Sequence, residues 1–332
     1  MIEISVIIPT RNRCFFLQKA LESLTKQTFS MERFEVIVID NGSTDDTKAI
    51  TESFDGKFKL QYHYDDRPGL HVGRHDGIKL SKSNLLAFAD DDIEAFPTWL
   101  EGIYESFQDK KVVLVGGKNL PLYENQPPFW IQQKWYQLCE FGHCICDLSI
   151  LDFGDEVRNI SPYYIWGCNF SIRKDVLLDA GGFHPDGMPF ELIRYRGDGE
   201  TYVSQYVIEH NLIALYNPKA SIYHLVPKER LSIDYFCKRA FCQGVSDSYT
   251  HLRNHTEKEI DYTPSSKWRK RIRTVLGIEG VGILKRIESQ LNLTDYDKQI
   301  KQSYEIGYSY HQSQYKRDIS IREWVHKENY IE

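Results

Sequence analysis

Over about the first ninety residues, short apolar runs alternate with longer stretches in which apolar residues recur every three or four positions. The short runs have the length of strands buried in a sheet and lie at 4–8, 36–39, 60–64 and 85–89. The longer stretches, at 15–26 and 72–80, have the spacing of amphipathic helices. Such an alternation with short connections predicts parallel βαβ units with right-handed crossovers. The predicted fold class is α/β with a mostly parallel central sheet.

Polar residues follow three of the predicted strands. Pro9, Thr10 and Arg11 follow the first strand, Asp40 ends the second, and an acidic run at 90–92 ends the fourth. Because ligands bind outside the carboxyl ends of the strands in such sheets, we expect the three clusters to meet at one rim. Their shared position favours a site for a nucleoside diphosphate and a metal ion.

The acidic run consists of Asp90, Asp91 and Asp92. Adjacent carboxylates repel one another unless a cation lies close by. On an extended strand end, Asp90 and Asp92 would point to the same side, since side chains alternate along a strand. Two such carboxylates suit Mg²⁺ or Mn²⁺, which share these ligands with the phosphates of a substrate. The alternative is a solvated acidic turn, the usual explanation of an isolated charge run.

Composition narrows the class of protein. The fractions of hydrophobic residues, 41%, and charged residues, 27%, are those of an ordinary globular chain. The net charge of -6 gives no electrostatic reason to expect nucleic acid as a partner. Seven cysteines, an odd number without regular spacing, indicate reduced thiols. The first residues lack the features of a signal peptide, and no apolar run is long enough to cross a bilayer. The expected location is the cytoplasm.

Three stretches carry a resemblance to a known family: 5–10, 38–47 and 87–92. They closely resemble family 2 of the inverting glycosyltransferases. The likeness covers about 4–244, with shorter motifs at 166–173, 180–183, 216–218 and 223–224. The family has the GT-A-type fold, an α/β domain that binds a nucleotide sugar. The resemblance implies a metal-dependent inverting transferase, with Mn²⁺ or Mg²⁺ as cofactor, that moves a sugar to a hydroxyl of a glycan or lipid-linked acceptor.

The resemblance also implies which residues form the site. The donor-binding residues would be Pro9, Thr10, Arg11, Asp40, Arg74, Asp90 and Asp91. The metal ligands would be Asp92, Asp90 and His224, and the acceptor-binding residues Trp166, Gly167 and Asp198. Within the donor set, Asp40 would accept a hydrogen bond from the ring N–H of a uracil. A UDP-sugar is therefore the expected donor.

Two positions depart from the pattern of the family. Asn41 stands where a second Asp is commoner, which leaves the base preference open. His75 follows Arg74 where the family often has Asn. For His224 a second role stays open, that of a histidine hydrogen-bonded at a strand end.

Two carboxylates precede a predicted helix at 202–210 and are candidates for the catalytic base. The family usually shows Gly-Glu-Asp here, with the Asp as base, and counting back from Asn211 places Glu200 at that position. We therefore expect Glu200 to be the base and Asp198 to orient the acceptor. Stabilisation of the helix N-terminus is the alternative role, but it does not account for the glycines that flank Asp198.

The expected organisation is a GT-A-type domain followed by a mainly helical extension. The domain would span 1–226, with a donor half at 1–117 and an acceptor half at 118–226, and the extension would span 227–332. Within the extension, 264–290 combines basic and apolar residues at helical spacing. This segment predicts either peripheral contact with the inner face of a membrane or a packing helix with a basic solvent face, and charge patterning favours the second.

Two other functions are compatible with parts of this pattern. A nucleotidyltransferase that makes nucleotide sugars uses a similar sheet and metal, but it usually has a glycine-rich loop after the first strand, and 9–13 contains no glycine. A catalytically inactive relative that binds glycan or a partner would have no structural reason to keep Asp40, Asp90, Asp92 and Glu200 acidic. Sugar transfer is therefore the predicted activity.

Overall fold

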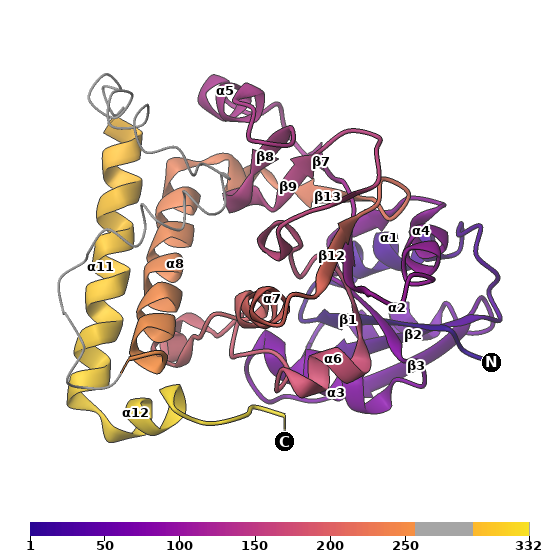
Figure 1. The fold of residues 1–332 in the computed structure, drawn as a ribbon, viewed down its shortest axis with the longest axis horizontal. Coiled ribbons are helices and arrows are strands. Elements are labelled where there is room, and N and C mark those ends of the chain that lie inside the picture. The colour runs from indigo at the N-terminus through magenta and orange to yellow at the C-terminus, as the bar shows by residue number, and fades with distance from the viewer. Residues whose placement is uncertain (256–294, 332) are drawn as a thin grey trace.

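The computed structural model describes residues 1–255 and 295–331 (Figure 1). The strands of its larger sheet are β1 (Ile4–Thr10), β2 (Phe34–Asp40), β3 (Lys59–Tyr64), β4 (Leu85–Ala89), β6 (Val112–Gly116), β10 (Arg158–Asn159), β11 (Asn169–Arg173) and β12 (Ile213–Tyr216). They lie in the order β10-β12-β6-β11-β4-β1-β2-β3. The first four strands are parallel, as predicted. The sheet as a whole is mixed, because β11 runs antiparallel to both β4 and β6.

Helices cover both faces of this sheet. On one face lie α1 (Cys14–Leu24), α2 (Thr47–Glu52) and α4 (Trp99–Ser106), and on the other α3 (Leu70–Leu80), α6 (Lys174–Asp179) and α7 (Glu200–Glu209). Alternate residues of the buried strands supply the two cores. Val6 and Val36 pack with the first group of helices, whereas Ile7 and Ile37 pack with the second. A strand buried on both faces needs apolar residues at consecutive positions, which explains its uninterrupted run.

A smaller sheet follows the acidic run. Its strands are β5 (Ile93–Ala95), β7 (Asn119–Tyr123), β8 (His143–Ile145), β9 (Ile150–Asp152) and β13 (Ile222–Val226), in the order β5-β13-β7-β9-β8. Beside it lie α5 (Phe129–Tyr136) and the short 3₁₀ turn η1 (Cys146–Leu148), whereas the 3₁₀ turn η2 (Pro162–Tyr164) packs against α7. Because β13 pairs antiparallel with β5, His224 comes opposite Ile93, next to the acidic run.

The C-terminal region is helical. Its elements are η4 (Lys228–Leu231), α8 (Ile233–Arg253), α11 (Asp295–Arg317) and α12 (Ile319–Val325). The long helices α8 and α11 lie side by side (Figure 1). Glycine allows their close approach, because a Cβ on Gly244 would lie 2.2 Å from the backbone oxygen of Tyr304. No helix of the described residues has the length and apolar character to span a membrane. The basic segment at 264–290 lies outside the described residues.

Candidate functional site

The three polar clusters meet at the carboxyl ends of β1, β2 and β4, as predicted. The hydroxyl of Thr10 donates a hydrogen bond of 2.7 Å to Oδ2 of Asp91. The backbone N–H of Asn41 donates to the carbonyl of Thr10 at 2.8 Å. The register of the parallel pairs, with Thr10 opposite Asp40, fixes this rim.

The acidic run is a turn rather than an extended strand end. The strand β4 ends at Ala89 and β5 begins at Ile93, so the alternation of side chains expected for Asp90 and Asp92 does not apply. Each carboxylate faces different partners. Asp90 lies 3.7 Å from Arg74, whereas Asp91 and Asp92 share Arg13.

Asp92 is buried among cationic groups. Its Oδ2 accepts hydrogen bonds from Arg13 at 2.7 Å and from Arg230 at 2.8 Å. Burial alone would raise the pKa of Asp92, but His224, Arg230 and Arg13 outweigh it and hold the pKa well below its usual range. Neither arginine is among the predicted site residues. Arg13 comes directly after β1, and that position is a signal that could have identified it. Arg230 reaches the rim only through the pairing of β13 with β5, which has no local signal.

The second oxygen of Asp92 bears on metal binding. Oδ1 is buried without a hydrogen-bond partner and lies 3.4 Å from Nε2 of His224. Nδ1 of His224 lies 2.9 Å from the carbonyl of Leu148, to which it donates, and Nε2 lies 3.3 Å from Arg230. Because arginine can only donate, the lone pair of Nε2 accepts from Arg230, and a metal ion bound between Nε2 and the unpaired Oδ1 of Asp92 would replace that contact. An oxygen and an imidazole nitrogen in this arrangement are suitable ligands for Mn²⁺.

Asp91 has a different environment from its two neighbours. It is buried and is held by Thr10 and by Arg13, whose Nε lies 2.9 Å from its Oδ1. Burial raises the pKa of Asp91 to about 7, although Arg13 opposes the shift. Asp91 therefore fixes the loop after β1, and its direct contact with a donor stays a prediction.

Asp40 lies buried at the end of β2. Its Oδ1 accepts the backbone N–H of Ser43 at 2.7 Å, and its Oδ2 accepts the hydroxyl of Tyr62 at 2.7 Å. Nδ2 of the neighbouring Asn41 is buried without a partner. A Cβ on Gly73 would lie 2.4 Å from Oδ1 of Asn41, so glycine at that position makes room for the amide.

Arg74 connects the donor rim to the predicted base. Its side chain is buried, with Nη2 3.7 Å from Asp90 and Nη1 3.4 Å from Oε2 of Glu200. The other oxygen of Glu200 accepts the backbone N–H of Gly167 at 3.2 Å. The structure therefore brings together four residues that the sequence analysis assigned to three different sets. It does so although they come from α3, the end of β4, the segment before β11 and the first turn of α7.

Asp198 has both carboxylate oxygens engaged inside the protein. Nδ1 of His184 lies 2.6 Å from Oδ1, and the hydroxyl of Thr250 donates to Oδ2 at 2.6 Å. The side chain is buried, whereas that of Glu200 is 21% exposed. These contacts tie the segment before α7 to helix α8. The predicted contact of Asp198 with an acceptor remains a prediction.

The remaining predicted residues lie around this centre. Pro9 is buried within β1, and Arg11 is exposed just beyond it. Trp166 is half-buried next to Gly167, and its Nε1 donates to the carbonyl of Tyr163 at 3.0 Å.

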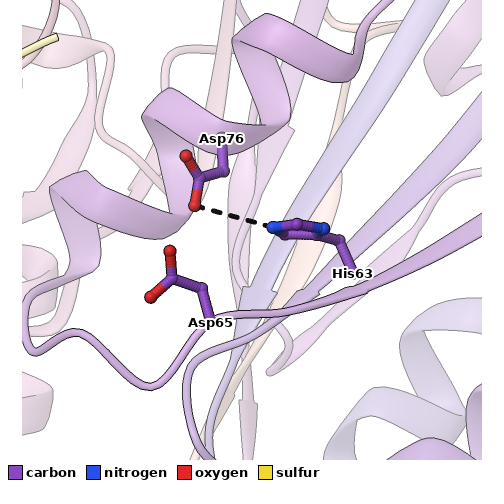
Figure 2. A group of neighbouring side chains, drawn as sticks. All are labelled: His63, Asp65 and Asp76. Carbon is purple, nitrogen blue, oxygen red and sulfur yellow. Dashed lines mark ion pairs between the residues drawn. The ribbon is translucent and has the colours of Figure 1, made fainter. Parts of the chain in front are cut away.

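A second group of potential metal ligands lies apart from the acidic turn, on β3, the loop after it and α3. Figure 2 shows His63, Asp65 and Asp76, the one set of three such residues with ligand atoms all within 4.8 Å in the described part of the chain. Arg67 donates to Oδ2 of Asp65 at 2.6 Å and lies 3.2 Å from Asp76. Lys79 also pairs with Asp76, at 3.1 Å. Cationic side chains pair with both carboxylates, and neither has a buried oxygen without a hydrogen-bond partner, unlike Asp92, so we assign no metal to this group.

Fold and site together define a class. A sheet whose parallel strands end in an acidic turn, with two further carboxylate-bearing segments beside it, is typical of GT-A-type transferases that use nucleotide sugars. The pattern described as "Glycosyl transferase family 2" matches residues 5–179, and the chain belongs to this family. The predicted family and the GT-A-type fold are confirmed, and the protein is a glycosyltransferase.

Three known proteins illustrate the similarity. Validoxylamine A glucosyltransferase of Streptomyces hygroscopicus subsp. jinggangensis is 25% identical, over 89% of this chain and 81% of that protein. The mannosyltransferase PcManGT of Pyrobaculum calidifontis, solved with GDP-Man and Mn²⁺, has a TM-score of 0.56 at 16% identity, covering 95% of this chain and 88% of that one. TarS 1-349 of S. aureus, solved with UDP-GlcNAc, has a TM-score of 0.51 at 15% identity, covering 95% and 92%.

Proposed function

We propose that the protein is a metal-dependent inverting glycosyltransferase that moves a hexose from a UDP-sugar to a hydroxyl of a glycan or lipid-linked acceptor. The observation that carries the proposal is the bridge made by Arg74 between Asp90 on the donor rim and Glu200 at the start of α7. Family membership favours transfer over nucleotide-sugar synthesis and over glycan binding without catalysis. The glucosyltransferase among the relatives supports a hexose donor.

Asp92, His224 and Asp90 are the proposed ligands of Mn²⁺ or Mg²⁺. The fit rests on Oδ1 of Asp92, a buried oxygen without a hydrogen bond that faces Nε2 of His224. The bound cation supplies charge that stabilises the leaving diphosphate. Arg13 and Arg230, which now pair with Asp92, lie where they can donate to the diphosphate oxygens.

Glu200 is the proposed base. Its carboxylate takes the proton of the acceptor hydroxyl while the hydroxyl oxygen bonds to the anomeric carbon. The bond from that carbon to the diphosphate breaks in the same displacement, and the nucleoside diphosphate leaves with the electron pair. Attack on the face opposite the leaving group inverts the anomeric centre. Gly167 and Trp166 border the position of the acceptor, and Gly167 also orients the base through its N–H.

Uracil is the base that we propose for the donor. Each oxygen of Asp40 can accept a second hydrogen bond, so Asp40 can take the ring N–H of uracil without losing Ser43 or Tyr62. The unpaired Nδ2 of Asn41 supplies a donor for a carbonyl oxygen of the same ring. A hydrogen bond to a charged group contributes about 1.5–3 kcal/mol, which is enough to favour a base with a ring N–H, such as uracil, over adenine or cytosine, which have none.

Calorimetric titration tests the proposed base of the donor and the proposed metal requirement. The protein is titrated with UDP, GDP and dTDP, each with Mn²⁺ and again in EDTA. We expect UDP to bind most tightly and to lose most of its affinity in EDTA. Tighter binding of GDP or dTDP would reassign the donor, and equal UDP affinity in EDTA would contradict the role of Asp92 and His224.

A further inference from the structure

A cavity of about 290 Å³ lies between α3, the 3₁₀ turn η3 (Phe190–Tyr195), and α12 with the residues that follow it. One stripe of α3, with residues three and four positions apart, forms its first wall, and that stripe includes His71, Val72 and His75. Arg74 projects from another side of the same helix, toward Glu200. The cavity is therefore separate from the donor site, although both use α3.

Aromatic and apolar side chains form most of the cavity wall. Trp324 packs edge-to-face against Tyr195 and Tyr330, with ring centroids 5.5 Å and 5.1 Å away. Nε1 of Trp324 donates to the carbonyl of Tyr195 at 2.8 Å, which fixes the indole. Met188 and Leu192 add apolar surface. A flat apolar body is the shape that such fixed rings accommodate.

The two histidines of the wall carry no charge at neutral pH. Burial lowers the pKa of His71 to about 4 and that of His75 to about 3. His75 is also held on both sides, because its Nδ1 lies 3.0 Å from the carbonyl of Tyr330 and its Nε2 accepts the N–H of Phe183 at 3.0 Å. Any charge that a ligand meets here comes from the rim.

The rim is cationic. Arg67, Lys79 and Lys327 line the cavity together with a single carboxylate, that of Asp76. Arg67 and Lys79 are anchored to Asp76, whose position Figure 2 shows beside His63, so their charges are held at the rim. Lys327 lies over the rings of Trp324 and Tyr330. Asp65 and Asp76 offset two of these three cations, which leaves one excess positive charge at the rim, and that excess favours an anion over a neutral sugar.

We propose that this cavity is a second ligand site, for a small organic anion with a flat apolar body, such as an aromatic carboxylate, sulfonate or phosphate. The ring system enters between Trp324, Tyr195 and Val72, and the anionic group stays at the rim. The volume admits a ligand of about two fused rings. The proposal concerns binding outside the donor site, so it does not depend on which sugar or acceptor the enzyme uses.

The cavity wall also contacts residues that hold the segment before Glu200 in place. The hydroxyl of Tyr330 lies 2.8 Å from that of Tyr249, and its ring lies 5.4 Å from His184. His184 in turn holds Asp198, two residues before Glu200. A ligand that restrains Tyr330 therefore restrains the segment that carries the base.

The test uses naphthalene-1-sulfonate, an anionic probe with two fused rings, with the full-length protein. We expect a single site by calorimetry and by fluorescence, with unchanged affinity in saturating UDP and Mn²⁺. Leu192→Trp, which fills the cavity, and Lys327→Glu, which reverses a rim charge, should each weaken binding at least tenfold. Lys110→Glu is the matched control, because it reverses the charge of an exposed lysine that is distant in sequence from the residues of the cavity. This variant should bind the probe like the wild type.

Hydrogen exchange provides the second readout. The bound probe should slow amide exchange in peptides covering 197–203, which lie outside the cavity wall, and Leu192→Trp should abolish that effect. Absence of a single site, displacement by UDP, or wild-type affinity in both Leu192→Trp and Lys327→Glu would overturn the ligand site. Binding without slower exchange in 197–203 would overturn the link to the catalytic segment. Failure of UDP to bind would instead bear on the proposed function alone.

Discussion

Glu200 and Asp198 lie two residues apart, yet their surroundings give them different chemistry. Glu200 is partly exposed and accepts one N–H from Gly167, with Arg74 beside it. Asp198 is buried, and each of its oxygens is engaged, one by His184 and the other by Thr250. A base needs an accessible oxygen within reach of the substrate, whereas a buried carboxylate held on both oxygens positions the backbone.

The first prediction separates these two roles. Glu200→Gln should lower kcat by about 10²–10⁴-fold, the usual contribution of a general base, and leave UDP affinity nearly unchanged. Asp198→Asn should lower the free energy of unfolding by about 1–3 kcal/mol, since it disturbs two buried hydrogen bonds. Steady-state kinetics and thermal unfolding of both variants test this. Near-normal turnover in Glu200→Gln, with its loss in Asp198→Asn, would move the base to Asp198.

The second prediction concerns the glycine beside the base. A Cβ at Gly167 would lie 1.9 Å from Nη2 of Arg74, so Gly167→Ala must displace the guanidinium from Asp90 and Glu200. Because a displacement of about 1 Å can cost about 10² in rate, we expect kcat/KM to fall about 10–100-fold while the protein stays folded. Kinetics and circular dichroism check this. Unchanged kcat/KM would show that the position of the Arg74 guanidinium does not affect catalysis.

At the scale of elements, the sequence predicts the strands of the donor half well. It predicts poorly how the later elements bring their residues to the same rim. The strands near 4–8 and 85–89 carry strong local signals, because burial on both faces demands apolar runs. The turn at 90–92 was predicted as extended, and the pairing of β13 with β5 has no local signal. The local sequence pattern therefore does not predict the residues that this pairing brings to the site, above all Arg230.

The third prediction tests this element. The turn η4 after β13 carries Arg230 toward Asp92, at 2.8 Å, where it can donate to a diphosphate. Arg230→Gln should weaken binding of UDP with Mn²⁺ by about tenfold or more, as expected for loss of a charge-assisted hydrogen bond. Lys228→Gln, an exposed residue of the same turn, is the matched control. Equal UDP affinity in Arg230→Gln and Lys228→Gln by calorimetry would remove Arg230 from the donor site.

At the scale of the whole molecule, the C-terminal residues return to the catalytic domain. The carbonyl oxygen of Tyr330 accepts a hydrogen bond from Nδ1 of His75, a residue that stands where the family often has Asn. Glycine at 182 makes this possible, because a Cβ there would lie 2.8 Å from Nε2 of His75. The departure at 75 was visible in the sequence, but its cause lies 255 residues away along the chain. The proposed division at residue 226 stays a prediction.

The fourth prediction follows from three buried histidines. Burial lowers the pKa of His71 and His311 to about 4 and that of His75 to about 3, below the 6.5 of an exposed imidazole. The unfolded chain therefore takes up protons that the folded chain does not, so stability is fully present above pH 6.5 and falls toward pH 4. The loss should be about 1.4 kcal/mol per pH unit for each histidine.

Denaturant unfolding at pH 7, 6 and 5 measures this dependence. His75→Gln keeps a hydrogen-bonding side chain but removes one titrating group, so its free energy of unfolding should vary less steeply with pH. Lys110→Gln serves as the control at an exposed site. A pH profile of His75→Gln that parallels the wild type would show that folding does not lower the pKa of His75.

The most direct test of the central claim is the release of free nucleoside diphosphate from UDP-sugars, followed with Mn²⁺ and again in excess EDTA. The wild type should release UDP, without pyrophosphate, only when the metal is present. Asp92→Asn should lose most release together with donor affinity, since Oδ1 of Asp92 faces His224 at the proposed metal position. Glu200→Gln should lose release but still bind UDP. Full release in EDTA, or release of pyrophosphate, would contradict the account.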